Sequence, residues 1–200
     1  GCKTNFFGNK EMEKLAFGMK NTQEAISIRN HILLTFEKLI LEKSRSDDGN
    51  WNIVIVGSGP TGVELAGAFS EMKKEILPRH YPYMNFSQLE IILGSSTEKP
   101  LAVMSHESQE KSEQYLKDLG VKFLSGEVVT DYDGDKVHLR SGATIPSNNV
   151  IWAAGVTGNV IEGFPSEKLV RNRYIVDRYN KIKGYDNIYA IGDIAYMETP

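Results

Sequence analysis

The sequence has little of what several common chemistries need. It contains one cysteine, Cys2, in 200 residues, which excludes an internal disulfide and a Cys-x-x-Cys redox pair. A lone cysteine fits a reducing compartment. No apolar run approaches the roughly 20 residues that a membrane-spanning helix needs. Positive and negative side chains nearly balance, 23 against 26, so neither nucleic acid nor an anionic membrane surface is expected as a partner of these residues.

Motifs for metal binding and nucleophilic catalysis are also missing. The acidic stretch Asp131–Asp135 resembles a calcium loop, but its glycine is misplaced and position twelve is Gly142 instead of Glu. We interpret it as a hairpin turn. No Walker A motif or G-x-S-x-G elbow is present. The histidines are scattered without metal-ligand spacing: His31, His80, His106 and His138.

What is present is a glycine-rich turn at the centre of the chain. The apolar run Ile53–Val56 stops at Gly57-Ser58-Gly59-Pro60-Thr61-Gly62, after which apolar residues resume at helical spacing. A strand, a tight turn and a helix in this order are typical of the phosphate-binding start of a Rossmann unit. Gly57 permits the turn, Gly59 lets a pyrophosphate approach the backbone, and Gly62 lets the helix pack close. The helix N-terminus then offers free N–H groups to the phosphates.

The rest of the chain predicts alternating elements around that turn. Residues 1–20 read as irregular, and a capped amphipathic helix over 22–45 with a core-facing apolar stripe follows them. Residues 44–50 form a polar domain entry, and Pro78 is expected to end the helix after the glycine turn. We predict a third helix over 107–119 and several short strands, which cover residues 89–93, 121–124, 128–130, 136–139, 144–145, 149–153, 174–177 and 187–191. The fold class is therefore α/β, with a parallel Rossmann-like sheet and a β-meander.

Four stretches resemble the type II, non-proton-pumping NADH:quinone oxidoreductases, a group of two-dinucleotide flavoproteins within the pyridine nucleotide-disulfide oxidoreductase superfamily. They are Thr4–Gly8, Asn21–Leu33, Val56–Gly67 and Trp152–Val156. The closing Tyr189–Asp193 resembles a stretch shared across the wider superfamily. The resemblance covers nearly all of the chain, and the pieces occur in family order.

This resemblance implies an FAD domain interrupted by an NADH domain. Residues 49–154 would form the NADH-binding domain, and residues 1–48 and 155–200 would be incomplete FAD-domain segments. Because the sequence opens without an initiator Met, we expect it to be an excised fragment. The resemblance implies NADH and quinone as small-molecule partners and FAD as the cofactor of the intact enzyme. The fragment itself is expected to be soluble, inactive and without bound FAD.

The resemblance also implies where the intact enzyme works. It would act as a peripheral protein on the cytoplasmic face of the inner or plasma membrane, and regions outside this sequence would contact the membrane. No nucleic acid is expected, and the oligomeric state is left open.

Candidate site residues follow from both lines of reasoning. Residues 57–62 are expected to hold the pyrophosphate of NADH. Glu64, the candidate catalytic residue, would face the nicotinamide and the flavin by resemblance; its alternative is an acidic residue that favours the first turn of a helix. Ala154 and Gly155 would pass under the nicotinamide or simply form a tight crossover between domains. Gly192 and Asp193 resemble the motif that binds the ribityl chain of FAD.

One expected residue is missing. NAD-binding domains usually carry Asp or Glu after the second strand to hold the adenosine ribose. Here Gly94-Ser95-Ser96 stands at that place, and the nearest carboxylates are Glu90 and Glu98. Ser95 is the candidate for contact with a ribose hydroxyl. No arginine replaces the carboxylate, so the choice of NADH over NADPH rests on the resemblance alone.

Two other functions remain open at this point. Another reductase of the superfamily, which acts on disulfides, ferredoxin or nitrite, would share most of these motifs. A non-catalytic NAD(H)-binding module would share the glycine turn but would have no use for the flavin motif at Gly192 and Asp193.

Overall fold

The computed structural model describes residues 1–41 and 50–198, which fall into two compact units. The larger unit is Phe6–Ala154, and the smaller one combines Gly1–Asn5 with Gly155–Pro200. The larger unit therefore begins at Phe6, whereas the sequence suggested a boundary at residue 49. The reason is that residues 17–41 contain a strand that joins the central sheet of that unit and a helix that packs against this sheet.

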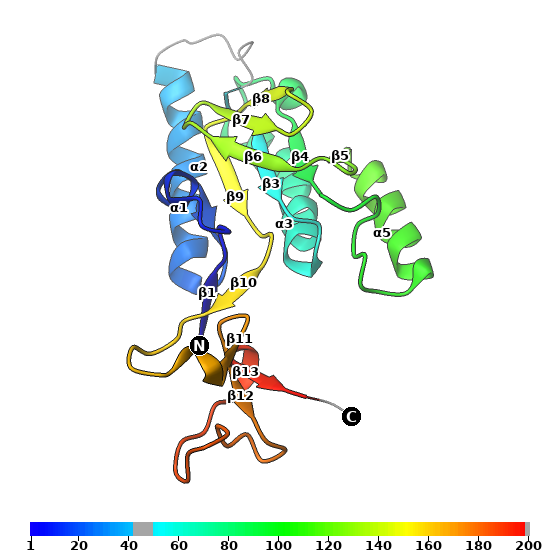
Figure 1. Cartoon of the computed structure of the whole chain (residues 1–200). Helices are drawn as coiled ribbons and strands as arrows, with labels where there is room; N and C mark the ends of the chain where they lie inside the picture. The colour runs from blue at the N-terminus through cyan, green and yellow to red at the C-terminus, as the bar shows by residue number, and fades with distance from the viewer. Residues whose placement is uncertain (42–49, 199–200) are drawn as a thin grey trace. The chain divides into compact units, whose positions relative to one another are not determined.

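A parallel sheet of five strands forms the centre of the larger unit (Figure 1). Its order is β2-β9-β3-β4-β5, and every neighbouring pair is parallel. The three inner strands are buried along their whole length, as expected for a parallel sheet covered on both faces. The strands are β2 (Phe17–Gly18), β9 (Asn149–Trp152), β3 (Ile53–Val56), β4 (Ile91–Gly94) and β5 (Lys122–Leu124).

Three helices of twelve or more residues contribute to the core on one face of this sheet. They are α2 (Thr22–Leu41), α3 (Pro60–Glu71) and α5 (His106–Asp118). The predicted N-cap of α2 is confirmed, because the Asn21 side chain accepts the Glu24 N–H at 3.0 Å. The apolar stripe of α2 enters the core as predicted, with Ile28, Ile32 and Phe36 buried. The predicted end of this helix and most of the polar entry at 44–50 lie outside the described residues.

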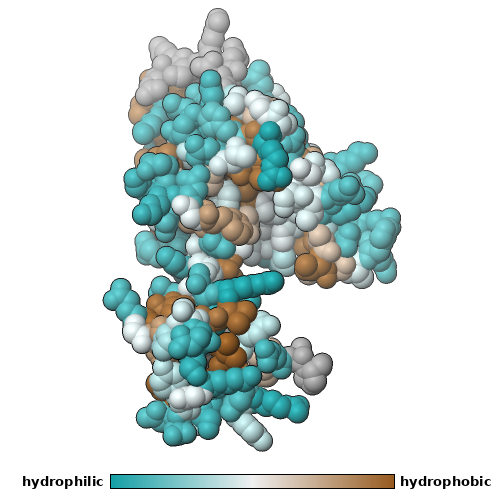
Figure 2. Space-filling view, viewed as in Figure 1, coloured by the Kyte–Doolittle hydropathy of each residue, from teal (hydrophilic) through white to brown (hydrophobic). Residues whose placement is uncertain are grey.

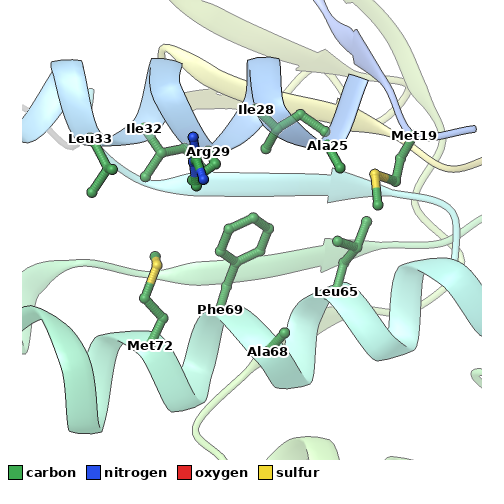
Figure 3. A pocket seen from close by; sticks show the side chains of 10 residues that line it. All are labelled: Met19, Ala25, Ile28, Arg29, Ile32, Leu33, Leu65, Ala68, Phe69 and Met72. Atoms are coloured by element: carbon green, nitrogen blue, oxygen red, sulfur yellow. The ribbon is translucent and has the colours of Figure 1, made fainter. Parts of the chain in front are cut away.

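A groove of about 210 Å³ runs between α2 and α3 (Figure 3). Arg29 is its one charged lining residue. The apolar part of the lining comes mainly from Ile28, Leu33, Leu65, Phe69 and Met72.

The meander covers the other face of the sheet. Its strands are β6 (Val129–Tyr132), β7 (Lys136–Leu139) and β8 (Thr144–Pro146), joined as an antiparallel sheet. They bury Val129, Tyr132, Val137 and Leu139 against the alternate residues of β3, β4 and β9. Helix α1 (Lys10–Leu15) adds Met12 to this second core. The predicted order of parallel sheet and meander is therefore confirmed.

Two local predictions are wrong. Residues 1–20 are not irregular, because they form β1 (Cys2–Thr4), α1 and β2. The helix after the glycine turn does not end at Pro78. It continues through a π-helical turn, η2 (Met72–Ile76), into α4 (Leu77–His80), where Pro78 occupies the first turn. Proline is tolerated there because the first helical N–H groups have no intrahelical partner.

The smaller unit consists of short pairings around a small core. β1 pairs with β10 (Val156–Gly158), and a second sheet joins β11 (Leu169–Val170), β12 (Arg173–Val176) and β13 (Ala195–Met197). The strand predicted over 187–191 is absent, because Tyr189 forms only an isolated bridge with Lys181. Four buried residues form the core, and Figure 2 shows apolar surface on the visible face of this unit.

Among the described residues, no helix combines the length and the apolar character needed to cross a membrane.

Candidate dinucleotide-binding site

The glycine turn joins β3 to α3 at the carboxyl end of the central strand. Gly57 has φ of +107°, a conformation that side chains disfavour, and its N–H donates to the Gly94 carbonyl at 2.8 Å. A Cβ atom on Gly57 would lie 2.6 Å from Ala154 Cα, so the backbone of the next strand closes the space. The turn therefore needs glycine here for two independent reasons.

Gly62 is needed for the packing of the helix. A Cβ atom there would lie 1.8 Å from the Gly57 carbonyl oxygen, which is backbone and cannot move aside. The helix consequently approaches the turn more closely than any side chain would permit. This contact fixes the direction in which the start of α3 points.

Gly59 differs from the other two glycines. It is the N-cap of α3 with φ of −70°, and a Cβ atom there would meet no atom within 4 Å. Pro60 follows at the first helical positions and has no N–H, so the N–H groups of Thr61 and Gly62 lead the helix. Open space in front of a helix N-terminus is what an anionic group requires.

A chain of hydroxyl groups, in which Ser58 and Ser95 are buried, supports the turn from the side of β4. The Ser58 and Ser95 oxygens are 2.6 Å apart, and the Ser95 and Thr97 oxygens are 2.8 Å apart. The Thr97 hydroxyl donates to the Lys99 carbonyl at 2.9 Å. The Ser58 carbonyl in turn accepts the Leu101 N–H at 2.8 Å. The glycine turn and the loop after β4 are thus held as one structure.

The neighbouring carboxylates do not take the place of the missing ribose-binding residue. Glu90 precedes β4 and forms an ion pair with Lys122 at 3.2 Å, so it belongs to the opposite end of the strand. Glu98 has an exposed side chain, and its carbonyl accepts the Ser125 hydroxyl at 2.8 Å. The turn at the end of β4 itself carries only glycine, serine and threonine.

Glu64 is exposed on α3. Because α3 begins at Pro60, Glu64 lies beyond the first turn, which contains no acidic residue. The alternative explanation, in which Glu64 stabilises the first turn, is therefore wrong. Among the described residues no basic side chain forms an ion pair with it. A carboxylate is thus available close to the start of α3.

The end of β9 is shaped by aromatic side chains that the sequence did not reveal as a group. The ring of Phe6 stacks on Trp152 at 5.7 Å, and the ring of Phe7 lies edge-on to Trp152 at 6.3 Å. Phe6 and Phe7 enter the unit together, just before α1. The small residues Ala153 and Ala154 then pass beside Gly57. A signal for this cluster did exist, since Phe6, Phe7 and Trp152 lie in stretches that carry the resemblance.

Gly155, Gly192 and Asp193 belong to the smaller unit. Gly155 has φ of +136°, and its carbonyl accepts the Asn5 N–H at 3.0 Å. Gly192 has φ of +78° and opens the short helix η5 (Gly192–Ile194), in which Asp193 is exposed. The motif therefore lies in a 3₁₀ turn before β13 and does not follow a regular strand.

Among the described residues, no group of three or more His, Cys, Asp or Glu could hold a metal ion. Asp133 instead makes the predicted hairpin turn between β6 and β7. Its carboxylate binds His138 at 2.8 Å and accepts the N–H groups of Asp135 and Lys136. These donors, His138 first, lower the pKa of Asp133 to about 2.

Comparison with known proteins identifies the family. Residues 14–200 match the pyridine nucleotide-disulphide oxidoreductase family. The chain belongs to this family. It is similar to the type II NADH:quinone oxidoreductase Ndh of Mycobacterium tuberculosis, with 27% identity over 213 residues that cover 99% of this chain and 45% of that protein.

Solved structures agree with this assignment. NDH2 from Plasmodium falciparum, in complex with NADH, superposes with a TM-score of 0.89 at 25% identity, which covers 98% of this chain and 43% of that one. A ferredoxin reductase from Rhodopseudomonas palustris has a TM-score of 0.72 at 18% identity, covering 100% of this chain and 43% of that one, and shares the fold. The chain spans less than half the length of these relatives. The resemblance to type II NADH:quinone oxidoreductases read from the sequence is thus confirmed.

Membership of the pyridine nucleotide-disulphide oxidoreductase family accounts for the glycine turn, whose geometry fits a dinucleotide. Because Gly59 has no side chain, the space in front of the start of α3 stays open, and we call this space the open cradle. Gly57 and Gly62, in contrast, are fixed by backbone contacts. The Ser58–Ser95–Thr97 chain of hydroxyl groups was not foreseen. The only signal for it in the sequence was the missing carboxylate.

Proposed function

We propose that this chain supplies the NADH-binding part of a flavoprotein NADH dehydrogenase, which passes hydride from NADH to FAD and then electrons to a quinone. The observation that carries the proposal is the open cradle at Gly59 in front of α3. Its support from comparison is the likeness to the Plasmodium falciparum NDH2, which was solved with NADH.

In this proposal residues 57–62 bind the pyrophosphate. The N–H groups of Thr61 and Gly62 and the positive end of the α3 dipole face its charge. Ser58 holds the turn to the loop after β4, and Ser95 lies at the ribose end. Ala154 and Gly155 leave room for the nicotinamide because neither has a side chain larger than a methyl group.

Glu64 is proposed to accept a hydrogen bond from the carboxamide of the nicotinamide. Its exposure and its position one turn into α3 support this role, since carboxyl ends of parallel strands are where ligands bind in such folds. Glu64 would orient the ring so that its reactive carbon faces the flavin. No proton transfer is required of Glu64 for a hydride step.

FAD, when bound, supplies the redox chemistry of such enzymes. We propose that the FAD-domain segments are those of the smaller unit, residues 1–5 and 155–200, with Gly192 and Asp193 toward the ribityl chain. The remaining FAD contacts, the quinone site and the membrane-binding surface on the cytoplasmic face would come from sequence outside these residues. The chain alone is therefore expected to bind NADH without retaining FAD.

A titration tests the proposal. NADH added to the purified chain should change the fluorescence of Trp152, which is close to the glycine turn, and calorimetry should give a saturable affinity. The same preparation should show no flavin absorbance and no NADH oxidation with added quinone. Quinone-dependent turnover by this chain would overturn the assignment of catalysis to the longer protein, and an absence of NADH binding would overturn the proposal itself.

A pair of ligands tests Glu64. The Glu64→Ala variant should bind NADH about fivefold more weakly, since it removes the acceptor and a hydrogen bond to a protein group contributes about 1 kcal/mol. Its affinity for ADP-ribose, which lacks nicotinamide, should not change. Glu71→Ala, another exposed position on α3, is the matched control. Equal weakening for both ligands would argue against contact with the nicotinamide.

A further inference from the structure

We infer that this chain does not discriminate between NADH and NADPH, because a closed chain of neutral hydroxyl groups occupies the place of the ribose-binding carboxylate. The inference rests on the proposed NADH site and concerns its ribose end. NAD-selective Rossmann sites place Asp or Glu after the second strand, where it binds the ribose hydroxyls and repels a 2′-phosphate. Here β4 ends at Gly94 and is followed by Ser95.

Hydrogen-bond directions in this chain are determined by its last acceptor. The Lys99 carbonyl can only accept, so the Thr97 hydroxyl donates its single proton there. Thr97 must then accept from Ser95, and Ser95 must accept from Ser58. Ser95 also accepts the Thr97 N–H at 3.1 Å. A hydroxyl has one proton and two lone pairs, so Ser95 has no capacity left.

The Ser95 hydroxyl therefore cannot accept a hydrogen bond from a ribose, which changes the role that the sequence suggested. Ser95 is 5% exposed and shapes the loop between β4 and α5 instead of binding the ligand directly. The Ser95 N–H is also engaged, because it donates to the Leu124 carbonyl at 3.1 Å. The hydrogen bonds of Ser95 therefore stabilise the loop itself. No carboxylate stands at this position to select one coenzyme over the other.

The charges around the loop give no selectivity in the other direction. NADP-selective sites use an arginine to bind the 2′-phosphate. Residues 95–105 contain no arginine, and their one lysine, Lys99, forms an ion pair with Glu113. Glu98 is the one carboxylate in this stretch, and its side chain is exposed. A 2′-phosphate would thus meet neither a strong attraction nor a fixed repulsion.

The test is a comparison of dissociation constants, measured by calorimetry with the chain and each of NADH, NADPH and ADP-ribose. The two coenzymes should differ by less than about tenfold. A preference above about tenfold for either coenzyme would refute this inference and leave the proposed NADH site intact. An absence of binding by all three ligands would instead refute the proposed function, and the inference with it.

A charge placed on the loop sharpens the comparison. Ser96 is exposed, so Ser96→Asp adds a carboxylate beside Ser95 without disturbing the hydrogen bonds between the Ser58, Ser95 and Thr97 hydroxyl groups. This variant should weaken NADPH binding at least tenfold more than NADH binding. Ser141→Asp, at an exposed turn of the meander, adds the same charge elsewhere and should leave the ratio unchanged. An unchanged ratio in folded Ser96→Asp would contradict the placement of the ribose at this loop.

Discussion

Substitution of Gly59 separates binding from folding more sharply than any other change in the glycine turn. The methyl group of Gly59→Ala would point into open space, and the backbone angles of this residue, φ −70° and ψ −179°, are available to alanine. Alanine restricts the unfolded chain, which stabilises by about 0.4–1 kcal/mol, but it is a poorer N-cap than glycine. The two effects oppose each other, so we expect the free energy of unfolding to change by less than about 1 kcal/mol.

Binding should respond far more strongly. The methyl group would occupy the space through which the pyrophosphate reaches the N–H groups at the start of α3. Hydrogen bonds to charged groups contribute about 1.5–3 kcal/mol each, so losing one weakens NADH binding by roughly 10- to 150-fold. Calorimetric titration with NADH and with ADP-ribose measures this loss, and both ligands should lose affinity equally because both contain the pyrophosphate.

Gly62→Ala provides the contrasting variant. Its methyl carbon would lie 1.8 Å from the Gly57 carbonyl oxygen, so the turn must move. Overpacking of this kind costs about 3 kcal/mol or more, which corresponds to a melting temperature lower by about 10 °C in a unit of this size. Thermal unfolding followed by circular dichroism compares the two variants directly.

Two outcomes for the Gly59→Ala protein would contradict these expectations, and they can be told apart. A folded Gly59→Ala protein that binds NADH with unchanged affinity would show that the pyrophosphate does not lie at this N-terminus. A Gly59→Ala protein that unfolds like Gly62→Ala would show that the space at residue 59 is needed for the fold.

Three further predictions concern the scaffold of the site. Asn149→Ala should lower the free energy of unfolding by about 1–3 kcal/mol in urea titrations, because the buried Asn149 amide donates to the Trp51 and Asn52 carbonyls, of which the Asn52 carbonyl keeps the Ser147 hydroxyl as a donor; a loss below 0.5 kcal/mol would contradict this. Phe36→Ala should cost about 3–5 kcal/mol, whereas Leu34→Ala, at an exposed position on α2, should cost much less in the same assay. Asp133 has its pKa lowered from its usual value near 3.9 to about 2, so its stabilising contribution is complete above about pH 4 and is lost as the pH falls toward 2. Asp133→Asn should remove this part of the pH dependence of unfolding, and an unchanged slope between pH 2 and 4 would refute it.

The parts of the fold that were predicted correctly depend on local requirements. The glycine turn could be recognised because two of its glycines meet local backbone requirements: Gly57 has a φ of +107°, and a Cβ atom on Gly62 would clash with the Gly57 carbonyl oxygen. Helix α5 was evident because Ser105 caps it and Gly120 follows it with φ of +76°. The hairpin turn at Asp133 also depends on local contacts, because its carboxylate accepts the N–H groups of Asp135 and Lys136. In each case the sequence signal and the stabilising contact lie within a few residues of each other.

The parts that were missed depend on partners far along the chain. Strand β2 has two residues, and it exists only because Phe17 and Gly18 pair with the distant strand β9. The strand expected at 187–191 has the right composition, yet its backbone finds only the single bridge from Tyr189 to Lys181. Pro78 predicts a helix end, but the π-helical turn before it carries the helix past this residue, and such a turn cannot be recognised from residue types.

The two ends of the proposed site differ in what holds them, and this difference has consequences for coenzyme choice. At the pyrophosphate end, Gly57 and Gly62 are constrained by backbone atoms, so most substitutions there would damage the fold as well as binding. At the ribose end, Ser58 and Ser95 come from positions 37 residues apart and stabilise a loop through side chains alone. Selectivity between NADH and NADPH can therefore change through single exposed positions such as Ser96 while the sheet, the turn and the pyrophosphate contacts stay the same. The family fold constrains where a dinucleotide binds far more tightly than which dinucleotide it is.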